Sequence, residues 1–237
     1  MSRAAAVLFD KDGTLFDFTA SWAPVTRAAL LDLAAGDPAR CARYAAAIGF
    51  DLARDRFDPD SPVIAGTGRD AAERLAAAGA GPSDRIEAEL NARAARARPV
   101  PAVPLRPLLA RLADHGLRLG VATNDAEAAA LVHLRAEAVA DLFAFVAGYD
   151  SGHGQKPDPG PLLAFAGVVR VAARDIVMVG DSLHDLPAGR AAGMKTVAVL
   201  TGPAPADTLA PFADVVLSHV GHLPAWLGLP PERPESD

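Results

Sequence analysis

The hydrophobic and polar positions of this chain follow two different patterns, which divide it into two parts. Short apolar runs alternate with amphipathic segments at the start of the chain and again from about residue 98, whereas residues 18–97 are rich in Ala, Leu, Arg and Glu. The first pattern is typical of a parallel sheet covered by helices on both faces, and the second of packed helices. We therefore expect an α/β core domain, residues 1–17 and 98–237, with an inserted all-helical domain, residues 18–97.

The core domain is expected to contain six buried strands, because each apolar run is short and is bounded by polar residues, Gly or Pro. The predicted strands are residues 4–9, 117–122, 143–147, 175–179, 196–200 and 215–217, and the predicted helices of this part are residues 105–114, 126–138, 160–167 and 185–192.

The insert is expected to contain four helices and no strand. They are predicted over residues 26–35, 38–48, 69–78 and 83–96. A Pro-rich stretch, residues 99–104, predicts a stiff linker that returns the chain to the core. The Pro- and charge-rich tail, residues 230–237, is expected to fray.

Composition and charge narrow the class of protein. The net charge is −6 and only three of the 23 basic residues are lysines, so the chain has no basic footprint for nucleic acid. A single cysteine excludes an internal disulfide, and no apolar run reaches the length of a membrane span. The first predicted strand begins too early for a signal peptide. We therefore expect a soluble cytoplasmic protein without nucleic-acid or membrane partners; its oligomeric state is not predicted.

Two carboxylates, Asp10 and Asp12, directly follow the first predicted strand, and Gly13 comes next. Side chains alternate along an extended chain, so these two acids could point the same way. An Asx turn in a solvated loop would explain one Asp and the Gly. It would not explain the second Asp, because like charges at close range are unfavourable without a cation or a proton. The pair therefore indicates a functional site.

Further polar clusters follow the other predicted strands. Taken alone, each has a structural explanation: Thr123-Asn124 is a good helix cap, Lys156-Pro157 a surface turn, and Asp181 and Asp185 loop or helix-start acids. Taken together, they would gather at one edge of a parallel sheet, where open α/β folds bind their ligands. The joint occurrence of these clusters is the evidence for a site.

The residue types at this edge point to phosphoryl transfer. The carboxylates of Asp10, Asp12 and Asp181 suit Mg²⁺, which binds a few carboxylates, waters and a substrate phosphate. The hydroxyl, amide and lysine of the other clusters suit the oxygens of a phosphoryl group. An aspartate can act as a nucleophile and form an aspartyl-phosphate. A carboxyl group two residues later can protonate the leaving oxygen and then activate water.

The four motifs, in their order along the chain, resemble those of the haloacid dehalogenase superfamily. Residues 10–15 are similar to its first motif, Thr123-Asn124 to the second, Lys156-Pro157 to the third and residues 180–185 to the fourth. The helix after the fourth motif is also like that of the family. The resemblance implies a Rossmann-like doubly wound core. It also implies that the insert is a helical C1 cap and that the chain is similar to phosphoglycolate-phosphatase-like members.

The resemblance also implies a role for each matching residue. Asp10 would be the nucleophile and Asp12 the general acid/base. Mg²⁺ would bind the Asp10 carboxylate, the Asp12 carbonyl and Asp181. The remaining roles are phosphate binding by Thr123 and Asn124, charge neutralisation by Lys156, and contact of Asp185 with Lys156 or with a water on the metal.

The expected activity is hydrolysis of a small phosphomonoester, phosphoglycolate-like or a sugar phosphate. Dehalogenating members lack the second aspartate of the first motif, so Asp12 favours phosphate chemistry. A phosphomutase also carries that aspartate and stays open as an alternative. A phospho-accepting receiver shares the acidic edge but has no reason to carry a large helical insert.

Two other groups of residues leave alternatives open. Residues 66–69 could reach into the site as a specificity loop with Arg69 binding an anionic substrate, or could simply start a helix. His219 and His222 are spaced like metal ligands, but no third ligand is evident nearby, which favours an ordinary surface loop.

Overall fold

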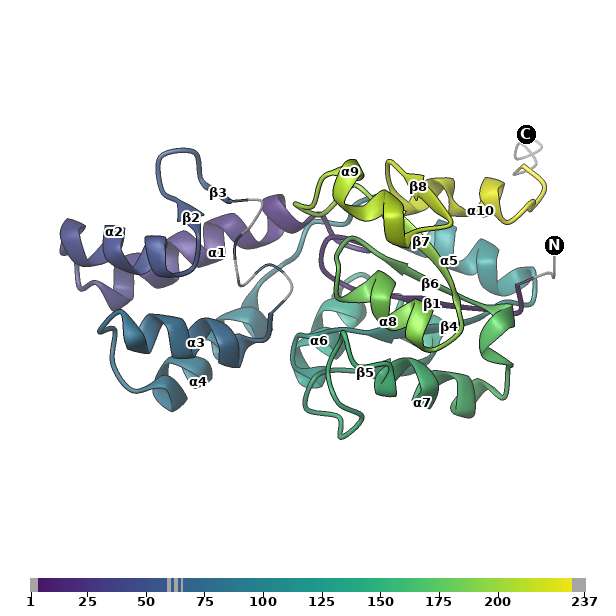
Figure 1. Cartoon of the computed structure of the whole chain (residues 1–237), viewed down its shortest axis with the longest axis horizontal. Helices are drawn as coiled ribbons and strands as arrows, with labels where there is room; N and C mark the ends of the chain where they lie inside the picture. The colour runs from purple at the N-terminus through teal and green to yellow at the C-terminus, as the bar shows by residue number, and fades with distance from the viewer. Residues whose placement is uncertain (1–3, 59–60, 62–63, 65, 232–237) are drawn as a thin grey trace.

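The computed structural model describes residues 4–58, 61, 64 and 66–231, and it has two lobes (Figure 1). One lobe contains the large sheet with its flanking helices. The other contains the helices of the insert. Within the described residues, no helix combines the length and apolarity needed to cross a membrane. The outer part of the 230–237 tail and several residues between 59 and 65 lie outside the described residues, so the expected fraying of the tail is not tested there.

The core sheet has six parallel strands in the order β5-β4-β1-β6-β7-β8. The strands are β1 (Ala6–Phe9), β4 (Arg118–Ala122), β5 (Phe143–Ala147), β6 (Ile176–Gly180), β7 (Lys195–Val199) and β8 (Val215–Leu217). The chain adds strands on one side of β1 and then crosses to the other side, which makes the sheet doubly wound and places a switch point at β1. The predicted Rossmann-like fold is confirmed.

Alternation along the central strand distributes its side chains between two hydrophobic cores. Val7 and Phe9 pack into the core formed with α5 and α6, whereas Ala6 and Leu8 pack into the core formed with α7 and α8. The sheet is therefore covered on both faces, which explains why its strands read as continuous apolar runs. The covering helices are α5 (Leu105–Asp114), α6 (Glu127–Ala136), α7 (Gly160–Val169) and α8 (Asp185–Ala191).

Several short elements of the core were not predicted from the sequence, because one turn carries no measurable hydrophobic period. They are α9 (Ala206–Leu209), α10 (Leu223–Trp226) and the 3₁₀ segments Ala140–Leu142, Ala173–Asp175, Ala210–Phe212 and Val220–His222.

The insert contains four helices, as predicted, and also a small hairpin that was not predicted. The helices are α1 (Phe18–Leu33), α2 (Pro38–Ala47), α3 (Gly68–Ala77) and α4 (Ser83–Arg96), and the antiparallel strands are β2 (Phe50–Asp51) and β3 (Arg56–Phe57). The expectation of a strand-free insert was therefore wrong. Strands of two residues are too short to show an alternating pattern, and the hairpin is held by an edge-to-face contact between Phe50 and Phe57.

Helix α1 begins at Phe18, well before the predicted start at residue 26. Proline is unfavourable inside helices, but Pro24 lies within this one, and Asp17 caps the true N-terminus by accepting a hydrogen bond from Ala20 N–H. This earlier start extends the N-terminal end of α1 to the core lobe (Figure 1).

The two chain segments that join the insert to the core run side by side. Asp17 N–H donates to the carbonyl of Val100, and Ala102 N–H donates to the carbonyl of Leu15, at 2.8 and 2.9 Å. The hydroxyl of Ser21 accepts a further bond from Val100 N–H. The entry and exit of the insert are therefore one hydrogen-bonded pair of segments and not two separate tethers.

Candidate active site

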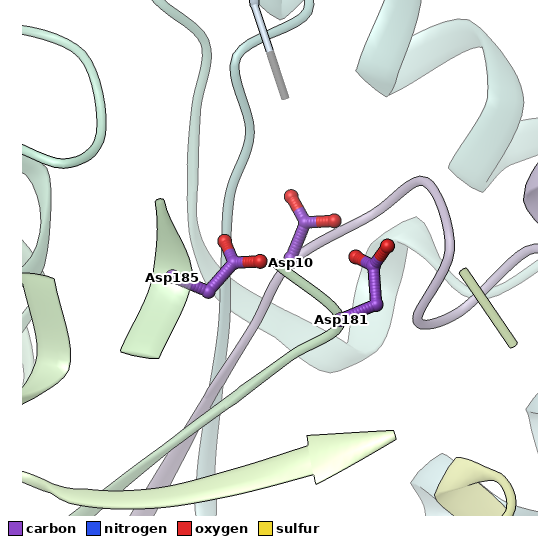
Figure 2. Close-up of side chains that lie close together, drawn as sticks. All are labelled: Asp10, Asp181 and Asp185. Atoms are coloured by element: carbon purple, nitrogen blue, oxygen red, sulfur yellow. The ribbon is translucent and has the colours of Figure 1, made fainter. Parts of the chain in front are cut away.

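Three buried carboxylates meet at the carboxyl edge of the sheet (Figure 2). Asp10 follows β1, Asp181 follows β6, and Asp185 begins α8. One oxygen from each lies within 4.8 Å of the others, and the three residues are 7%, 3% and 1% exposed. Like charges this close, away from water, are unfavourable unless a cation or protons accompany them. The cluster is therefore a candidate cation site.

Lys156 supplies one positive charge to this cluster. Its Nζ lies 2.6 Å from Asp10 Oδ1 and 2.6 Å from Asp185 Oδ1. Burial by itself would lower the pKa of Lys156, but the two carboxylates outweigh it and hold that pKa above its ordinary value. Three carboxylates and one ammonium leave a net charge of −2 when all are ionised. This donor set fits a small divalent cation such as Mg²⁺.

Two of the three carboxylates, those of Asp10 and Asp181, hold protons more tightly than ordinary carboxylates do, because their pKa values are raised. Burial is the main cause that raises the pKa of Asp10 to about 7, with Asp185 and Asp12 adding to it and Lys156 opposing it. Burial, followed by repulsion from Asp10, also raises the pKa of Asp181 well above its ordinary value. Without a cation, the folded cluster therefore favours partial protonation.

The metal-free protein is expected to lose stability from Asp10 as pH rises. Between the ordinary pKa of 3.8 and the folded value of about 7, the folded protein keeps a proton that the unfolded chain has released. The stability that this proton contributes is full below the lower value and is lost as pH rises to the upper one. Melting temperatures in EDTA between about pH 5 and 8 should therefore fall more steeply for the wild type than for Asp10→Asn. Equal slopes of melting temperature against pH for the two proteins would contradict the raised pKa of Asp10.

Glycines allow the backbone to close around Asp181. A Cβ at Gly13 would lie 2.3 Å from Asp181 Oδ2, and one at Gly202 would lie 1.7 Å from the same oxygen. Gly13 also has a φ of +85°, a conformation that side chains disfavour. The glycine of the first motif is therefore required both for the turn after β1 and for the close approach of the fourth-motif acid.

Asp12 lies beside this cluster and contacts the insert. Its Oδ1 accepts a hydrogen bond of 2.9 Å from the indole N–H of Trp22 in α1, and its Oδ2 lies 2.7 Å from Lys11 Nζ. Asp12 and Asp10 both line the pocket between the two lobes. The predicted metal contact through the Asp12 carbonyl stays a prediction. The carboxylate itself is oriented by one residue of the core and one of the insert.

Lys11 is one of the residues near the site that sequence reasoning missed. Its side chain is fully buried, and its Nζ lies 2.7 Å from Asp12 Oδ2, 3.1 Å from Asp125 Oδ2 and 3.1 Å from His133 Nδ1. It also lies 5.3 Å from the ring centre of Trp22. The available signal was a lysine directly after an apolar strand in a chain with only three lysines.

His133 connects Lys11 to the insert. Its Nε2 lies 2.7 Å from the carbonyl oxygen of Ala94 in α4. Burial and then the charge of Lys11 lower the pKa of His133, which favours a neutral ring. A neutral ring protonated at Nε2 would donate to Ala94 and accept from Lys11 at Nδ1. This chain of contacts joins the first motif to the insert across the domain boundary.

The second and third motifs support each other. The side chain of Asn124 donates to the carbonyl of Lys156 at 2.9 Å and accepts from Lys156 N–H at 3.0 Å. Thr123 is buried, and its hydroxyl accepts from Asp125 N–H. Both residues line the pocket. The two hydrogen bonds of the Asn124 amide hold the backbone of the loop that carries Lys156. Phosphate binding by Thr123 and Asn124 stays a prediction.

The structure combines parts of both interpretations of residues 66–69. Thr67 caps α3 in a capping box with Asp70, so the segment starts a helix. Gly66, Thr67 and Gly68 line the pocket, but Arg69 does not; its guanidinium contacts Glu73, Asp84 and Glu87. The alternative in which Arg69 binds an anionic substrate is therefore not supported.

The histidine pair also has a structural explanation. His219 accepts from Gly221 N–H and caps a 3₁₀ turn, and its ring stacks on His222 with 4.2 Å between centroids. This agrees with the surface-loop interpretation.

The fold and this edge place the chain among doubly wound α/β proteins that have a cluster of aspartates at the carboxyl edge of the sheet, here facing an inserted domain. The family model described as haloacid dehalogenase-like hydrolase matches residues 4–193, and the chain belongs to that family. The resemblance stated from the motifs is confirmed.

Curated relatives include phosphoglycolate phosphatases. The protein of that name from Rhodospirillum rubrum is 37% identical over 123 residues, which are 52% of this chain and 51% of the relative. The one from Yersinia pseudotuberculosis is 34% identical over 123 residues, 52% of this chain and 53% of the relative. The chain thus spans about half the length of the curated relatives it matches.

Solved structures show the same fold over nearly the whole chain. A predicted phosphoglycolate phosphatase from Haemophilus somnus superposes with a TM-score of 0.72 at 19% identity, covering 95% of this chain and 99% of that one. β-Phosphoglucomutase from Clostridium difficile superposes with a TM-score of 0.68 at 18% identity, covering 93% of each chain. At these identities the likeness concerns the fold and not the reaction.

Proposed function

We propose that the protein is a Mg²⁺-dependent phosphatase that hydrolyses a small phosphomonoester through an aspartyl-phosphate. The observation that carries this proposal is the buried cluster of Asp10, Asp181 and Asp185 with Lys156 bound to Asp10. Such a cluster combines a nucleophile, a site for a divalent cation and a fixed positive charge. The family membership and the phosphoglycolate phosphatases among the relatives support the same class of reaction.

Asp10 and Asp181 would hold the metal, with Asp185 positioning Lys156. When bound, Mg²⁺ would supply positive charge to the substrate's phosphoryl oxygens. The fit rests on the excess negative charge of three buried carboxylates over one lysine. Lys156 would favour the ionised form of the Asp10 carboxylate and would attract the phosphoryl group to the same place.

The proposed reaction uses the two first-motif acids, Asp10 and Asp12. A carboxylate oxygen of Asp10 attacks phosphorus and the phosphorus–ester oxygen bond breaks. Asp12 gives its proton to the leaving oxygen and later takes a proton from the water that attacks phosphorus and releases Asp10. The contacts of Asp12 with Trp22 and Lys11 hold its carboxylate at the pocket, where both proton transfers would occur.

The protein is expected to release inorganic phosphate from p-nitrophenyl phosphate over many turnovers in Mg²⁺, and to stop when EDTA removes the metal. Addition of excess Mg²⁺ should restore the rate. Insensitivity to EDTA would contradict the metal assignment. A single stoichiometric phosphorylation would favour the receiver alternative, and isomerisation of a sugar phosphate without net phosphate release would favour the phosphomutase alternative.

A further inference from the structure

The insert presents a continuous apolar stripe to the pocket above the acidic cluster. Phe18, Trp22, Val25, Ala29 and Leu33 of α1 all line the pocket. Their spacing of three or four residues places them on one face of the helix. The stripe includes Trp22, whose indole contacts Asp12, and therefore leads from the candidate general acid into the insert.

The other helices of the insert continue this surface. Ala71 and Leu75 of α3, Leu90 and Ala94 of α4, and Phe57 of β3 line the same pocket. The pocket holds about 200 Å³. A cavity of roughly 150 Å³ with apolar walls can hold a benzene molecule. The pocket therefore has room for a phosphoryl group at the sheet and a small apolar group within the insert.

The positive charge on the insert side of the pocket is paired with carboxylates of the insert. Among the described residues that line the pocket, Arg93 is the one arginine, and its Nη2 lies 2.8 Å from Asp32 and 2.7 Å from Glu89. Of the uncharged polar side chains there, Thr67 bonds to Asp70 and Asn91 donates to Tyr149, and the hydroxyl of Thr26 carries no charge. A second anionic group on a substrate would therefore lose its hydration without gaining a strong partner.

We infer that the substrate's organic part is an uncharged, apolar group about the size of one aromatic ring or a short alkyl chain. This inference rests on the proposed phosphatase activity and goes beyond it. Phosphoglycolate, after which the relatives are named, carries a carboxylate in place of such a group. The apolar wall of α1, α3 and α4 would instead contact the leaving group and exclude water around Asp12.

A homologous series of n-alkyl phosphates, from methyl to hexyl, tests the inference by phosphate release. Each methylene buried in the pocket is expected to raise kcat/KM about fourfold until the pocket is full. Propyl phosphate, which is close to phosphoglycolate in size, should be hydrolysed at least about tenfold more efficiently than phosphoglycolate. A flat series, or a preference for phosphoglycolate, would overturn the inference and leave the phosphatase proposal standing. Absence of turnover on every ester, p-nitrophenyl phosphate included, would overturn both.

A variant of α3 assigns the effect to the pocket. Ala71→Leu adds volume to the pocket wall and should lower kcat/KM for hexyl phosphate by at least about tenfold, with less than about a twofold effect on methyl phosphate. Ala77→Leu is the matched control, because Ala77 is exposed on the same helix and does not line the pocket. Equal losses for both esters in Ala71→Leu would show that the insert does not contact the leaving group and would overturn the inference.

Discussion

Replacement of Asp10 by Asn is expected to lower kcat for p-nitrophenyl phosphate by at least about 10⁴-fold, because an amide is a poor nucleophile and cannot form the aspartyl-phosphate. The substitution keeps the shape of the side chain at the end of β1. Lys156 keeps one of its two carboxylate partners, Asp185, at 2.6 Å. Steady-state phosphate release at saturating Mg²⁺ measures the effect.

The fold of this variant should be intact. The substitution would remove one of three crowded buried carboxylates, so the melting temperature in EDTA near pH 8 should be no lower than that of the wild type. Asp158→Asn is a suitable control, because Asp158 is an exposed acid in the loop after Lys156 and lies outside the acidic cluster. The control should keep the wild-type rate within about threefold. An Asp10→Asn enzyme within about tenfold of the wild-type rate would remove Asp10 as the nucleophile.

Replacement of Lys11 by Met is expected to destabilise the protein by about 3 kcal/mol, because breaking a buried ion pair leaves a charge without its partner. Two carboxylates, Asp12 and Asp125, would lose their common cation, and His133 would lose the donor to its Nδ1. Both acids are partly exposed, at 16% and 15%, so we expect the lower end of the range for buried pairs. Met keeps the length and apolar character of the lysine stem.

The melting temperature should fall by roughly 10 °C in this variant. Arg174→Met is the control, because Arg174 is 82% exposed and lies 3.9 Å from Asp175. A surface pair of this kind contributes little, and its loss should change the melting temperature by no more than about 2 °C. A similarly small change in Lys11→Met would mean that the buried contacts of Lys11 are offset by the cost of its dehydration.

The core strands could be predicted to within two residues, because a strand buried on both faces leaves a clear apolar run bounded by polar residues. The insert was harder to predict. The β2–β3 hairpin depends on a contact between Phe50 and Phe57 and not on any local period. Helix α1 starts at Phe18, where Asp17 caps it, and it tolerates Pro24 in its interior. In a sequence pattern the proline is a stronger signal than the cap, so the helix was predicted to start after Pro24.

The convergence of Asp10, Lys156 and Asp181 was also predictable, because parallel strands bring their carboxyl ends to one edge. The contacts of Lys11 were not. The sequence separation between Lys11 and His133 is 122 residues, and that between His133 and Ala94 is 39. Burial of a lysine beside two acids depends on the domain interface, which no local signal describes. The apolar wall of the pocket could not be predicted for the same reason, because its prediction requires knowing which helix faces oppose the sheet.

The paired connections at residues 15–17 and 100–102 have a consequence for how this architecture can diversify. The insert leaves and rejoins the core at adjacent points, so its length and internal structure are topologically independent of the register between β1, β4 and β6. The entropy of closing such an excursion grows only slowly with its length. An insert of a different size or lining could therefore replace this one without any change in the strand order of the sheet. Evolution could thereby change the leaving group that the proposed phosphatase accepts while Asp10, Asp181 and Lys156 stay in place.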